Sequence, residues 1–139
     1  MVVVDGQGVP LGCQIASASP AEVTLVESTL ATIRVPRKGR GRPKTKPERL
    51  IGDKAYDSDP LRHKLKQRGI DLIAPNRRNR KKKTQDGRKL RRYRRRWVVE
   101  RTFAWLQTFR RLVVRYEHHV RLYRAFFHLA CLIVALRHL

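Results

Sequence analysis

Two carboxylates in this sequence stand where catalytic groups commonly gather. Asp53 follows residues 49–52, which read as a short buried strand, and the carboxyl ends of strands in open α/β sheets collect catalytic groups. Glu100 lies in a helical pattern that also contains Tyr93. At about 100° per residue, Arg96, Glu100 and Gln107 lie roughly 300°, 340° and 320° around that helix from Tyr93. These four side chains share one narrow stripe, which indicates a helix face aimed at a ligand.

Carboxylate oxygens bind hard divalent cations, and this is the chemistry that the pair favours. Cys13 and Cys131 are the only cysteines, and neither they nor the five histidines show the spacing of a zinc site. We interpret both cysteines as buried apolar residues. Metal binding then falls to Asp53 and Glu100, which favour Mg²⁺ or Mn²⁺. Two such ions can activate a water or a DNA 3′-hydroxyl for in-line phosphoryl displacement, so the pair indicates nuclease or transposase chemistry.

The first half of the chain predicts the elements that position Asp53. Val2–Val4 and 11–15 read as strands joined by the turn residues 5–10, which predicts a β-hairpin. Ser19 is expected to cap a helix that runs to about Ile33. The order from residue 49 is strand, helix and strand, with the helix starting at Ser58 or Asp59, closing at Gly69, and followed by strand 70–74. This order favours a parallel strand pair in a mixed α/β fold.

The last third of the chain is predicted to be helical. Helix-forming residues resume near Arg88 and continue through the segment that contains Glu100, and a final helix begins near Val120. The aromatic residues of the first segment are predicted to be core, and one side of the final helix is predicted to be buried. The expected core aromatics are Trp97, Phe103, Trp105 and Phe109, and the expected side of the final helix carries Leu122, Phe126, Leu129 and Ile133.

The charge of the chain points to a polyanionic partner. It carries 33 Lys and Arg against 11 Asp and Glu, a formal net charge of +22, and such self-repulsion is usually retained because the partner is nucleic acid. Two basic loops are expected, 34–48 and 76–88, and the first half of the basic run 77–96 is expected to be a mobile loop. We expect Arg77, Arg78 and Arg80 to track phosphates, although a solvated charge run is the usual alternative.

A shorter motif in the first loop and the apolar pattern complete the expectations about partners. Arg40-Gly41-Arg42-Pro43, inside Lys38–Lys46, resembles the core of an AT-hook, whose arginines enter an A·T minor groove, but a basic linker is the favoured interpretation. The longest apolar stretch, 125–136, contains His128 and is too short to span a bilayer. Without a secretory signal, we expect a cytoplasmic, nucleoid-associated protein with no membrane partner.

The motifs together resemble a known enzyme family over nearly the whole chain. The residues that carry the likeness are Gly52-Asp53-Lys54-Ala55-Tyr56-Asp57-Ser58, then Leu72-Ile73-Ala74-Pro75, then Tyr93-x2-Arg96-x3-Glu100-x6-Gln107, and finally Arg110-Arg111 through Arg115-Tyr116-Glu117. This pattern is similar to the C-terminal half of the DDE transposases of bacterial insertion-sequence families four and five. The resemblance implies an RNase H-like fold, incomplete here, and DNA cleavage and strand transfer at insertion-sequence ends.

The resemblance also assigns roles to individual residues. It implies that Asp53 and Glu100 are the second and third catalytic carboxylates and bind the metal. We expect Tyr93, Arg96 and Gln107, on the same helix face, to contact DNA; the alternatives are that Tyr93 is at the edge of the core and that Arg96 is only a surface partner of Glu100. Gln107 departs from the Lys usual in the family, so it can donate a hydrogen bond to DNA but supplies no charge. Lys54 and Tyr56 beside Asp53 are further candidates for contacts to DNA.

The first catalytic Asp of such a site has no clear counterpart here. Asp5 follows three valines and is one candidate, but Asp5-Gly6-x-Gly8-x-Pro10 resembles the hairpin turn after the first strand, and we favour that interpretation. We therefore expect residues 1–139 to be a single, N-terminally truncated catalytic domain, inactive alone. An upstream segment would supply the missing Asp, and three origins stay open: a second reading frame, a decayed remnant or a truncated gene prediction. A homodimer on DNA is a further expectation.

Simpler interpretations stand beside the catalytic one. Asp53 could be a turn or capping carboxylate, with Asp57 and Asp59 competing for any role, and Glu100 could pair only with Arg96 on the helix surface. The alternative for the whole chain is a basic DNA- or RNA-binding protein without catalysis, which needs the charge but not the carboxylates. The heptapeptide 52–58 and the stripe around Glu100 favour the enzyme.

Overall fold

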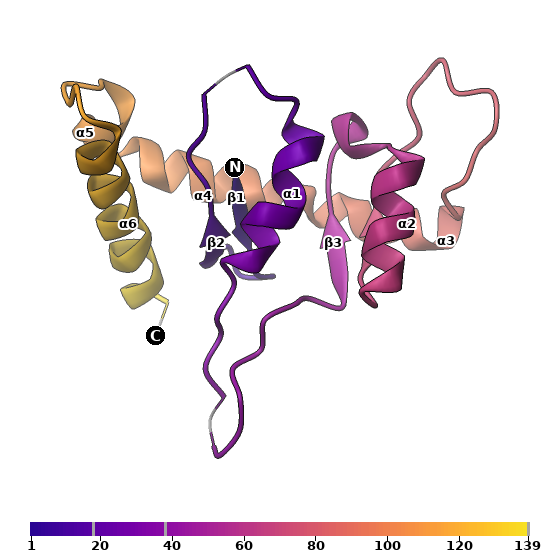
Figure 1. Ribbon diagram of the computed structural model, residues 1–139, viewed down its shortest axis with the longest axis horizontal. Coiled ribbons are helices and arrows are strands. Elements are labelled where there is room, and N and C mark those ends of the chain that lie inside the picture. Colours follow the sequence, from indigo (N-terminus) through magenta and orange to yellow (C-terminus); the bar gives the residue numbers. More distant parts are fainter. Residues whose placement is uncertain (18, 38, 139) are drawn as a thin grey trace.

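The chain folds into a mixed α/β structure, seen in a computed structural model that describes residues 1–17, 19–37 and 39–138 (Figure 1). Mixed α/β architecture was the expectation from the sequence, and it is confirmed. The elements are β1 (Val2–Val4), β2 (Pro10–Cys13), α1 (Glu22–Ala31), β3 (Arg49–Ile51), η1 (Lys54–Tyr56), α2 (Asp59–Gln67), β4 (Asp71–Ile73), α3 (Gly87–Leu90), η2 (Arg91–Arg96), α4 (Trp97–Gln107), α5 (Arg110–Val113) and α6 (Val120–Leu136).

The predicted N-terminal hairpin is present, and its turn is held by Asp5. β1 and β2 pair antiparallel, with Val2 opposite Cys13, so the second strand ends two residues before the predicted boundary. Oδ1 of Asp5 accepts hydrogen bonds from the backbone N–H groups of Gln7 at 2.8 Å and Val9 at 2.9 Å. A carboxylate that caps its own turn in this way supports the turn interpretation of Asp5.

The predicted parallel pair is also present. β3 pairs with β4 in parallel, with Leu50 opposite Leu72, and α2 forms the crossover. Ser58, one of the two residues expected to open this helix, caps α2, since its Oγ accepts from the N–H of Leu61. Gly69 follows the helix with a φ of +73°, a left-handed conformation that favours glycine.

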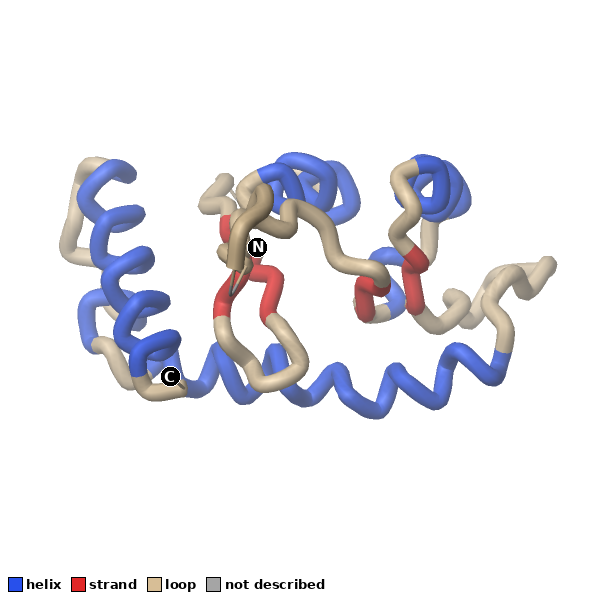
Figure 2. The backbone as a smooth tube through the Cα atoms, turned by 90° about the horizontal axis from the view of Figure 1, so that it is seen from below, coloured by secondary structure: helices blue, strands red, loops and turns tan. Residues whose placement is uncertain are grey.

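The two sheets lie side by side between two helical layers. The strands run in the order β2, β1, β3, β4 across the molecule, with α1 and α2 on one side and the continuous stretch η2–α4 on the other (Figures 1 and 2). α1 contacts both strands of the hairpin, α4 contacts β1, and η2 contacts β3. The main core lies between the strands and the layer formed by α1 and α2, and it contains Val26, Leu30, Ile33, Leu61, Leu65, Ile70, Leu72 and Ala74.

α1 is shorter than the sequence predicts. It begins at Glu22, with Ala21 as an extended N-cap that makes no side-chain capping bond, so the predicted cap at Ser19 is wrong. The backbone carbonyl of Ala21 instead accepts both the N–H and the hydroxyl of Thr24. At the other end Thr32 stops the helix, because its hydroxyl donates back to the Thr29 carbonyl and accepts the N–H of Cys13.

The aromatic residues of α4 are less buried than predicted. Trp97 is 53% exposed and Phe103 is 43% exposed, whereas Trp105 and Phe109 are partly buried beside a second, smaller core cluster. The prediction that Trp97 and Phe103 are core residues is therefore wrong. The helix buries a different stripe, Val98, Thr102 and Leu106. Thr102 contacts the hairpin turn at Gly8, and Leu106 packs in the second core cluster with residues of α6.

The docking of α4 on the hairpin turn depends on a close approach at Gly8. The hydroxyl of Thr102 donates to the Gly8 carbonyl at 2.7 Å in a buried position. Gly8 has a φ of +91°, and a Cβ added there would lie 2.9 Å from Oγ1 of Thr102. The guanidinium of Arg101 lies 4.7 Å from the ring centres of Trp97 and Trp105, and it donates to the Gln7 carbonyl. The exposed Trp97 is thus covered on one face by a cation.

The final helix buries a face different from the predicted one. Ala130 and Val134 of α6 are buried, and Phe127 and Cys131 pack with them. Leu122 is 52% exposed and Leu129 is 51% exposed, so the predicted burial of these two residues is wrong. The reason is that, among the described residues, α6 packs mainly on α4, α5 and β2, and helical periodicity alone fits several faces of such an apolar helix.

Both cysteines are partly buried thiols. Burial raises the pKa of Cys131 to about 12 and raises the pKa of Cys13 above its usual value. Both side chains therefore stay protonated near neutral pH, consistent with their interpretation as apolar residues. Among the described residues, no helix combines the length and the apolar character needed to cross a bilayer.

The close approach at Gly8 predicts a specific sensitivity to substitution. Gly8→Ala should lower the free energy of unfolding by about 1–2 kcal/mol or more, because the left-handed backbone and the Thr102 hydroxyl both resist a Cβ. Gly6→Ala is the matched control, since nothing lies within 4 Å of a Cβ at Gly6. Urea unfolding followed by circular dichroism measures both variants, and equal destabilisation would contradict this account of the turn.

Candidate active site

Asp53 lies at the carboxyl end of β3, as predicted. It is the N-cap of η1, with Oδ1 accepting the N–H of Ala55 at 2.8 Å. Gly52 before it extends the parallel ladder by donating to the carbonyl of Ile73 at 3.0 Å. A Cβ at Gly52 would lie 2.9 Å from the ring of Tyr56, so the glycine admits that ring beneath the turn. The half-buried Asp53 carboxylate is thereby held on a short, tightly packed turn.

Tyr56 and Lys54, two predicted DNA contacts, differ in how they are placed. The Tyr56 hydroxyl donates to Oε2 of Glu22 at 2.9 Å, which ties the turn to α1. Burial, together with this bond to Glu22, raises the pKa of Tyr56 above its ordinary range. The Lys54 side chain is exposed. Tyr56 thus has a structural partner already, whereas Lys54 extends to solvent.

Asp57 is the most buried acidic residue near the site, and sequence reasoning did not assign its role. Its side chain is 1% exposed and accepts from Arg62 Nη2 at 3.1 Å, Arg80 Nη1 at 2.9 Å and the backbone N–H of Arg77 at 2.8 Å. Burial by itself raises the pKa of this carboxyl, but these three donors outweigh it and hold the pKa below its usual value. The sequence offered one indication of this role, which is that acidic residues are rare in so basic a chain. The donors that bond to Asp57 could not be inferred, because two of them lie far along the sequence.

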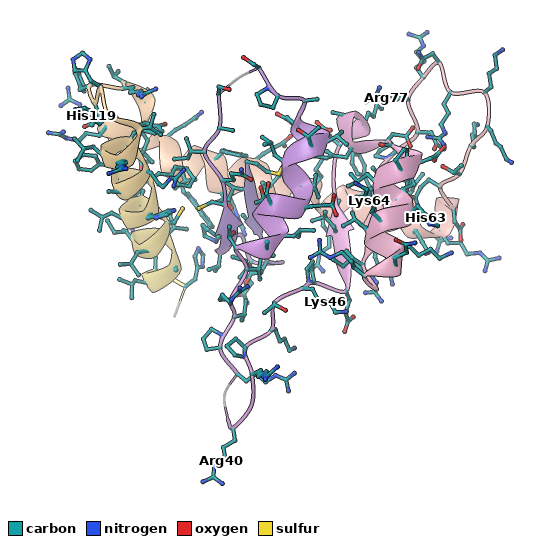
Figure 3. The ribbon with its side chains drawn as sticks, viewed as in Figure 1. Arg40, Lys46, His63, Lys64, Arg77 and His119 are labelled. Carbon is teal, nitrogen blue, oxygen red and sulfur yellow. The ribbon has the colours of Figure 1, made fainter. Side chains whose placement is uncertain are left out.

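The bonds around Asp57 tie the start of the second basic loop to the Asp53 turn. Arg77 donates from Nη2 to the Ala55 carbonyl at 2.9 Å and from Nε to the Lys54 carbonyl at 3.3 Å (Figure 3). Arg80 also pairs with Asp59, and Arg62 donates to Oε1 of Gln85 at 2.6 Å near the end of the loop. Hydrogen bonds therefore attach the second basic loop, which carries the expected phosphate contacts, to the turn that carries Asp53.

The cations of the second basic loop fall into two groups, those bound to protein acceptors and those exposed to solvent. Arg77 and Arg80 use their guanidinium groups to bind protein carbonyls and carboxylates, so they hold the loop in place. Arg78 and the lysines 81–83 are exposed and extend from the same loop. The second group is the one that the structure leaves accessible to a phosphate backbone.

The predicted stripe around Glu100 is present, although its first turn has a different geometry. Residues 91–96 form the 3₁₀ segment η2, in which residues three apart eclipse one another, so Tyr93 and Arg96 align directly. The Arg96 guanidinium lies 5.8 Å from the centre of the Tyr93 ring and pairs with Oε1 of Glu100. The Glu100 side chain is 55% exposed. Gln107 is the exposed last residue of α4.

The two carboxylates come from elements that pack together. β3, which delivers Asp53, packs on η2, which leads directly into the α4 turn that bears Glu100. Carboxylates of this kind have the hard oxygen donors that suit Mg²⁺ or Mn²⁺. Over residues 1–17, 19–37 and 39–138, however, no three His, Cys, Asp or Glu residues gather closely enough to hold a metal ion. Asp53 and Glu100 fit such an ion by type but provide only part of a ligand set.

Comparisons with known proteins agree with the pattern of this site. The family described as "Transposase DDE domain" matches residues 1–135. The chain is 37% identical over 133 residues to a Burkholderia cepacia protein that is provisionally named as the transposase for insertion sequence element IS402. The match covers 96% of this chain and 60% of that relative, so the chain spans about three-fifths of the relative's length. No solved structure matches the chain.

The Asp57 cluster predicts a pH-dependent contribution to stability. Asp57→Asn should lower the free energy of unfolding at pH 7 by about 1–3 kcal/mol, because it removes charge-assisted hydrogen bonds. The folded-state pKa of Asp57 is lowered, so its contribution is complete above the unfolded value of about 3.9 and is lost as the pH falls through the folded value. Thermal unfolding from pH 7 to pH 3 should therefore show the gap between wild type and variant closing at the acid end.

Asp59→Asn is the control for the Asp57 prediction. The Asp59 side chain is 61% exposed, so its pairing with Arg80 should contribute less than about 1 kcal/mol. Trypsin gives a second measurement, because the loop is rich in Lys and Arg and Asp57 holds its start. Asp57→Asn should be cut faster than Asp59→Asn within residues 77–83, and equal rates would show that Asp57 does not anchor the loop.

Proposed function

The chain belongs to the transposase DDE domain family, and we propose that it forms the larger part of a catalytic domain that cuts DNA at insertion-sequence ends and joins them to target DNA. The observation that carries this proposal is the packing of β3, which ends in Asp53, on the helical stretch that bears Glu100. Asp53 and Glu100 are proposed as two of the three catalytic carboxylates. Membership of the family comes from the sequence match, and the residue roles are our proposal.

We propose an incomplete RNase H-like fold, and the sheet arrangement supports it. β1 and β3 are the inner strands of two separate two-stranded sheets, and each pairs on one side only within the described residues. Both sheets lie on the same helical stretch η2–α4 (Figure 2). A single strand placed between β1 and β3 would bond to both inner edges and join the pairs into one five-stranded mixed sheet. Unpaired strand edges favour such an addition.

The inserted strand would also supply the missing carboxylate. If it runs parallel to β3, its carboxyl end reaches the same edge of the sheet as Asp53, where an Asp could join the site. Asp5 does not take this role in our proposal, because its carboxylate is engaged by the N–H groups of Gln7 and Val9. The strand would come from a segment encoded upstream of residue 1, and residues 1–139 would be inactive without it.

The residues of this chain prepare the site for phosphoryl transfer. The Ala55 N–H fixes one oxygen of Asp53, and the pairing with Arg96 restrains Glu100 on its helix face. A divalent cation such as Mg²⁺, when held by these carboxylates and the first Asp, supplies positive charge for the attacking and leaving oxygens of an in-line displacement. Arg96 lies beside Glu100, so it is placed to bind a DNA phosphate as well as to neutralise the carboxylate.

The proposed DNA path follows the accessible cations and polar groups around the two carboxylates. Lys54 of the Asp53 turn and Arg78 of the second basic loop are exposed, and Gln107 is exposed at the end of α4. We propose that Arg77, Arg80 and Tyr56 act chiefly by holding the loop and the turn, since their polar groups already bond to protein partners. Tyr93 is proposed to contact DNA together with Arg96, which lies over its ring.

The proposed activity can be tested with the chain joined to the segment encoded directly upstream of its first codon. This protein should cleave a duplex that carries an insertion-sequence end when Mg²⁺ or Mn²⁺ is added. Asp53→Asn and Glu100→Gln should each reduce the cleavage rate at least on the order of 100-fold, because each removes an anionic ligand of the divalent cation that would stabilise the reacting phosphate. Fluorescence anisotropy should show that both variants still bind the duplex.

Glu48→Gln is the matched control for these two variants. Glu48 is an exposed carboxylate five residues before Asp53, and its replacement should leave cleavage unchanged. If no version cleaves while all bind DNA, the chain acts as a non-catalytic DNA-binding protein and the proposal is wrong. An upstream reading frame that encodes no apolar strand with an Asp would overturn the proposed completion of the sheet.

A further inference from the structure

The first basic loop forms a ribbon that projects from the body of the protein. We use "basic ribbon" for residues 34–37 and 39–47, between α1 and β3; Lys38, which belonged to the predicted motif segment, lies outside the described residues. Val35 and Lys44 form an antiparallel bridge, with N–H to carbonyl distances of 2.9 Å and 2.8 Å. Beyond the bridge the ribbon extends away from both helical layers, and Arg40 lies at its far end (Figure 3).

Cations at the base of the ribbon are bound to the protein. Nη1 of Arg34 donates to the carbonyls of Ala31 at 3.0 Å and Ile33 at 2.8 Å, at the end of α1. Nζ of Lys46 donates to the carbonyl of Arg68 at 2.8 Å, at the end of α2 (Figure 3). These bonds fix the two ends of the ribbon to two different helices, so the direction in which it projects is set by the fold.

Cations beyond the bridge make no such bonds. The side chains of Arg37, Arg40 and Arg42 are exposed, and none of them has a hydrogen bond or an ion pair to another described residue. The sequence has no Asp or Glu between Glu27 and Glu48, so no acid within the ribbon offsets this charge. These arginines make no hydrogen bond or ion pair that would stabilise the described fold. Their concentrated positive charge therefore indicates binding of an external anion.

We propose that the tip Arg40-Gly41-Arg42-Pro43 inserts into the minor groove of A·T-rich DNA, at a contact separate from the carboxylate site. A·T tracts have a narrow minor groove with enhanced negative potential, which attracts inserted arginines. This inference rests on the proposed action on DNA but not on the catalytic roles of Asp53 and Glu100. It gives the motif a binding function where composition alone favoured a basic linker.

The residues next to the two tip arginines fit insertion into a narrow groove better than they fit a simple contact to phosphate. Gly41 has a φ of +138° and no side chain, so the backbone between the two arginines is thin where it would meet the floor of the groove. Pro43 restricts Arg42 to extended conformations, which suits a chain lying along a groove about 6 Å wide. Phosphate binding requires only charge, and it does not explain glycines at 39 and 41 or the proline.

The test compares two duplexes of equal length, one A·T-rich and one G·C-rich, with the full chain at fixed salt. Fluorescence anisotropy should show tighter binding to the A·T-rich duplex by wild type. Arg40→Ala/Arg42→Ala should weaken binding to the A·T-rich duplex on the order of tenfold more than binding to the G·C-rich duplex. Netropsin, a minor-groove ligand, should displace the wild-type ribbon contact and should have little effect on this variant.

Two controls separate groove insertion from charge. Arg121→Ala/Arg124→Ala removes the same charge from exposed positions on α6 and should weaken both duplexes equally. Arg40→Lys/Arg42→Lys keeps the charge but loses the planar guanidinium groups, so it should reduce the A·T preference while nearly retaining G·C affinity. Circular dichroism should give the same unfolding midpoint for wild type and both tip variants, because the tip lies beyond the bridge.

Each result supports or contradicts the proposed contact between the ribbon tip and the minor groove. Equal weakening of both duplexes by Arg40→Ala/Arg42→Ala would reduce the ribbon to a phosphate contact and overturn the proposal, as would stronger competition by double-stranded RNA than by A·T-rich DNA. Asp53→Asn and Glu100→Gln should keep the A·T preference even without cleavage. Failure of the proposed catalysis and failure of the ribbon contact are therefore distinguishable.

Discussion

The buried carboxylate of Asp57 is the interaction on which the arrangement of the site depends. It collects donors from α2, through Arg62, and from the second basic loop, through Arg80 and the N–H of Arg77. Arg62 at the same time donates to the carbonyls of Leu72 and Ala74, so the end of β4 belongs to the same cluster. One charge thereby joins the Asp53 turn, the crossover helix and the loop. Because removing one partner of a buried ion pair leaves an uncompensated charge, these elements are held to one another.

Asp57 illustrates how a chain with +22 net charge can still fold around its cations. Acids are too few to pair with most of the Lys and Arg residues, so the fold often uses backbone carbonyls as acceptors. Arg34, Lys46 and Arg101 each donate to a carbonyl at the end of a helix or in a turn. Cations that find no such acceptor remain on projecting segments, where only an external anion can neutralise them. The division between structural and accessible cations thus follows from the supply of acceptors.

The sequence predicted the parts of the structure that depend on local chemistry. Asp5-Gly6-x-Gly8 specifies its own turn, Ser58-x-Pro60 specifies the start of α2, and the heptapeptide around Asp53 places that residue after β3. Burial on the helices was predicted less well, because periodicity shows that a helix has an apolar face but not which neighbour covers it. Trp97 illustrates this, since the Gly8 turn selects the Thr102 stripe of α4 and leaves the indole outside.

The role of Asp57 could not be predicted for a related reason, since its acceptor function depends on contacts 5, 20 and 23 residues away in sequence. Tyr93, Arg96 and Glu100 were predicted to share a stripe, and they do, although the 3₁₀ geometry of η2 aligns the first two more closely than an α-helix would. The predicted stripe is retained despite this change, because Arg96 and Glu100 remain one turn apart.

The separation of the two sheets has a consequence for how the carboxylates are positioned. The pairs β1–β2 and β3–β4 share no ladder among the described residues, so the helices that pack on both pairs set the distance between them. Side-chain packing allows small sliding motions that a hydrogen-bonded ladder between strands does not. A strand inserted between β1 and β3 would replace this packing with hydrogen bonds along both edges, and it would bring the first Asp in the same step. In the proposed enzyme, completing the sheet and completing the active site are therefore one structural event.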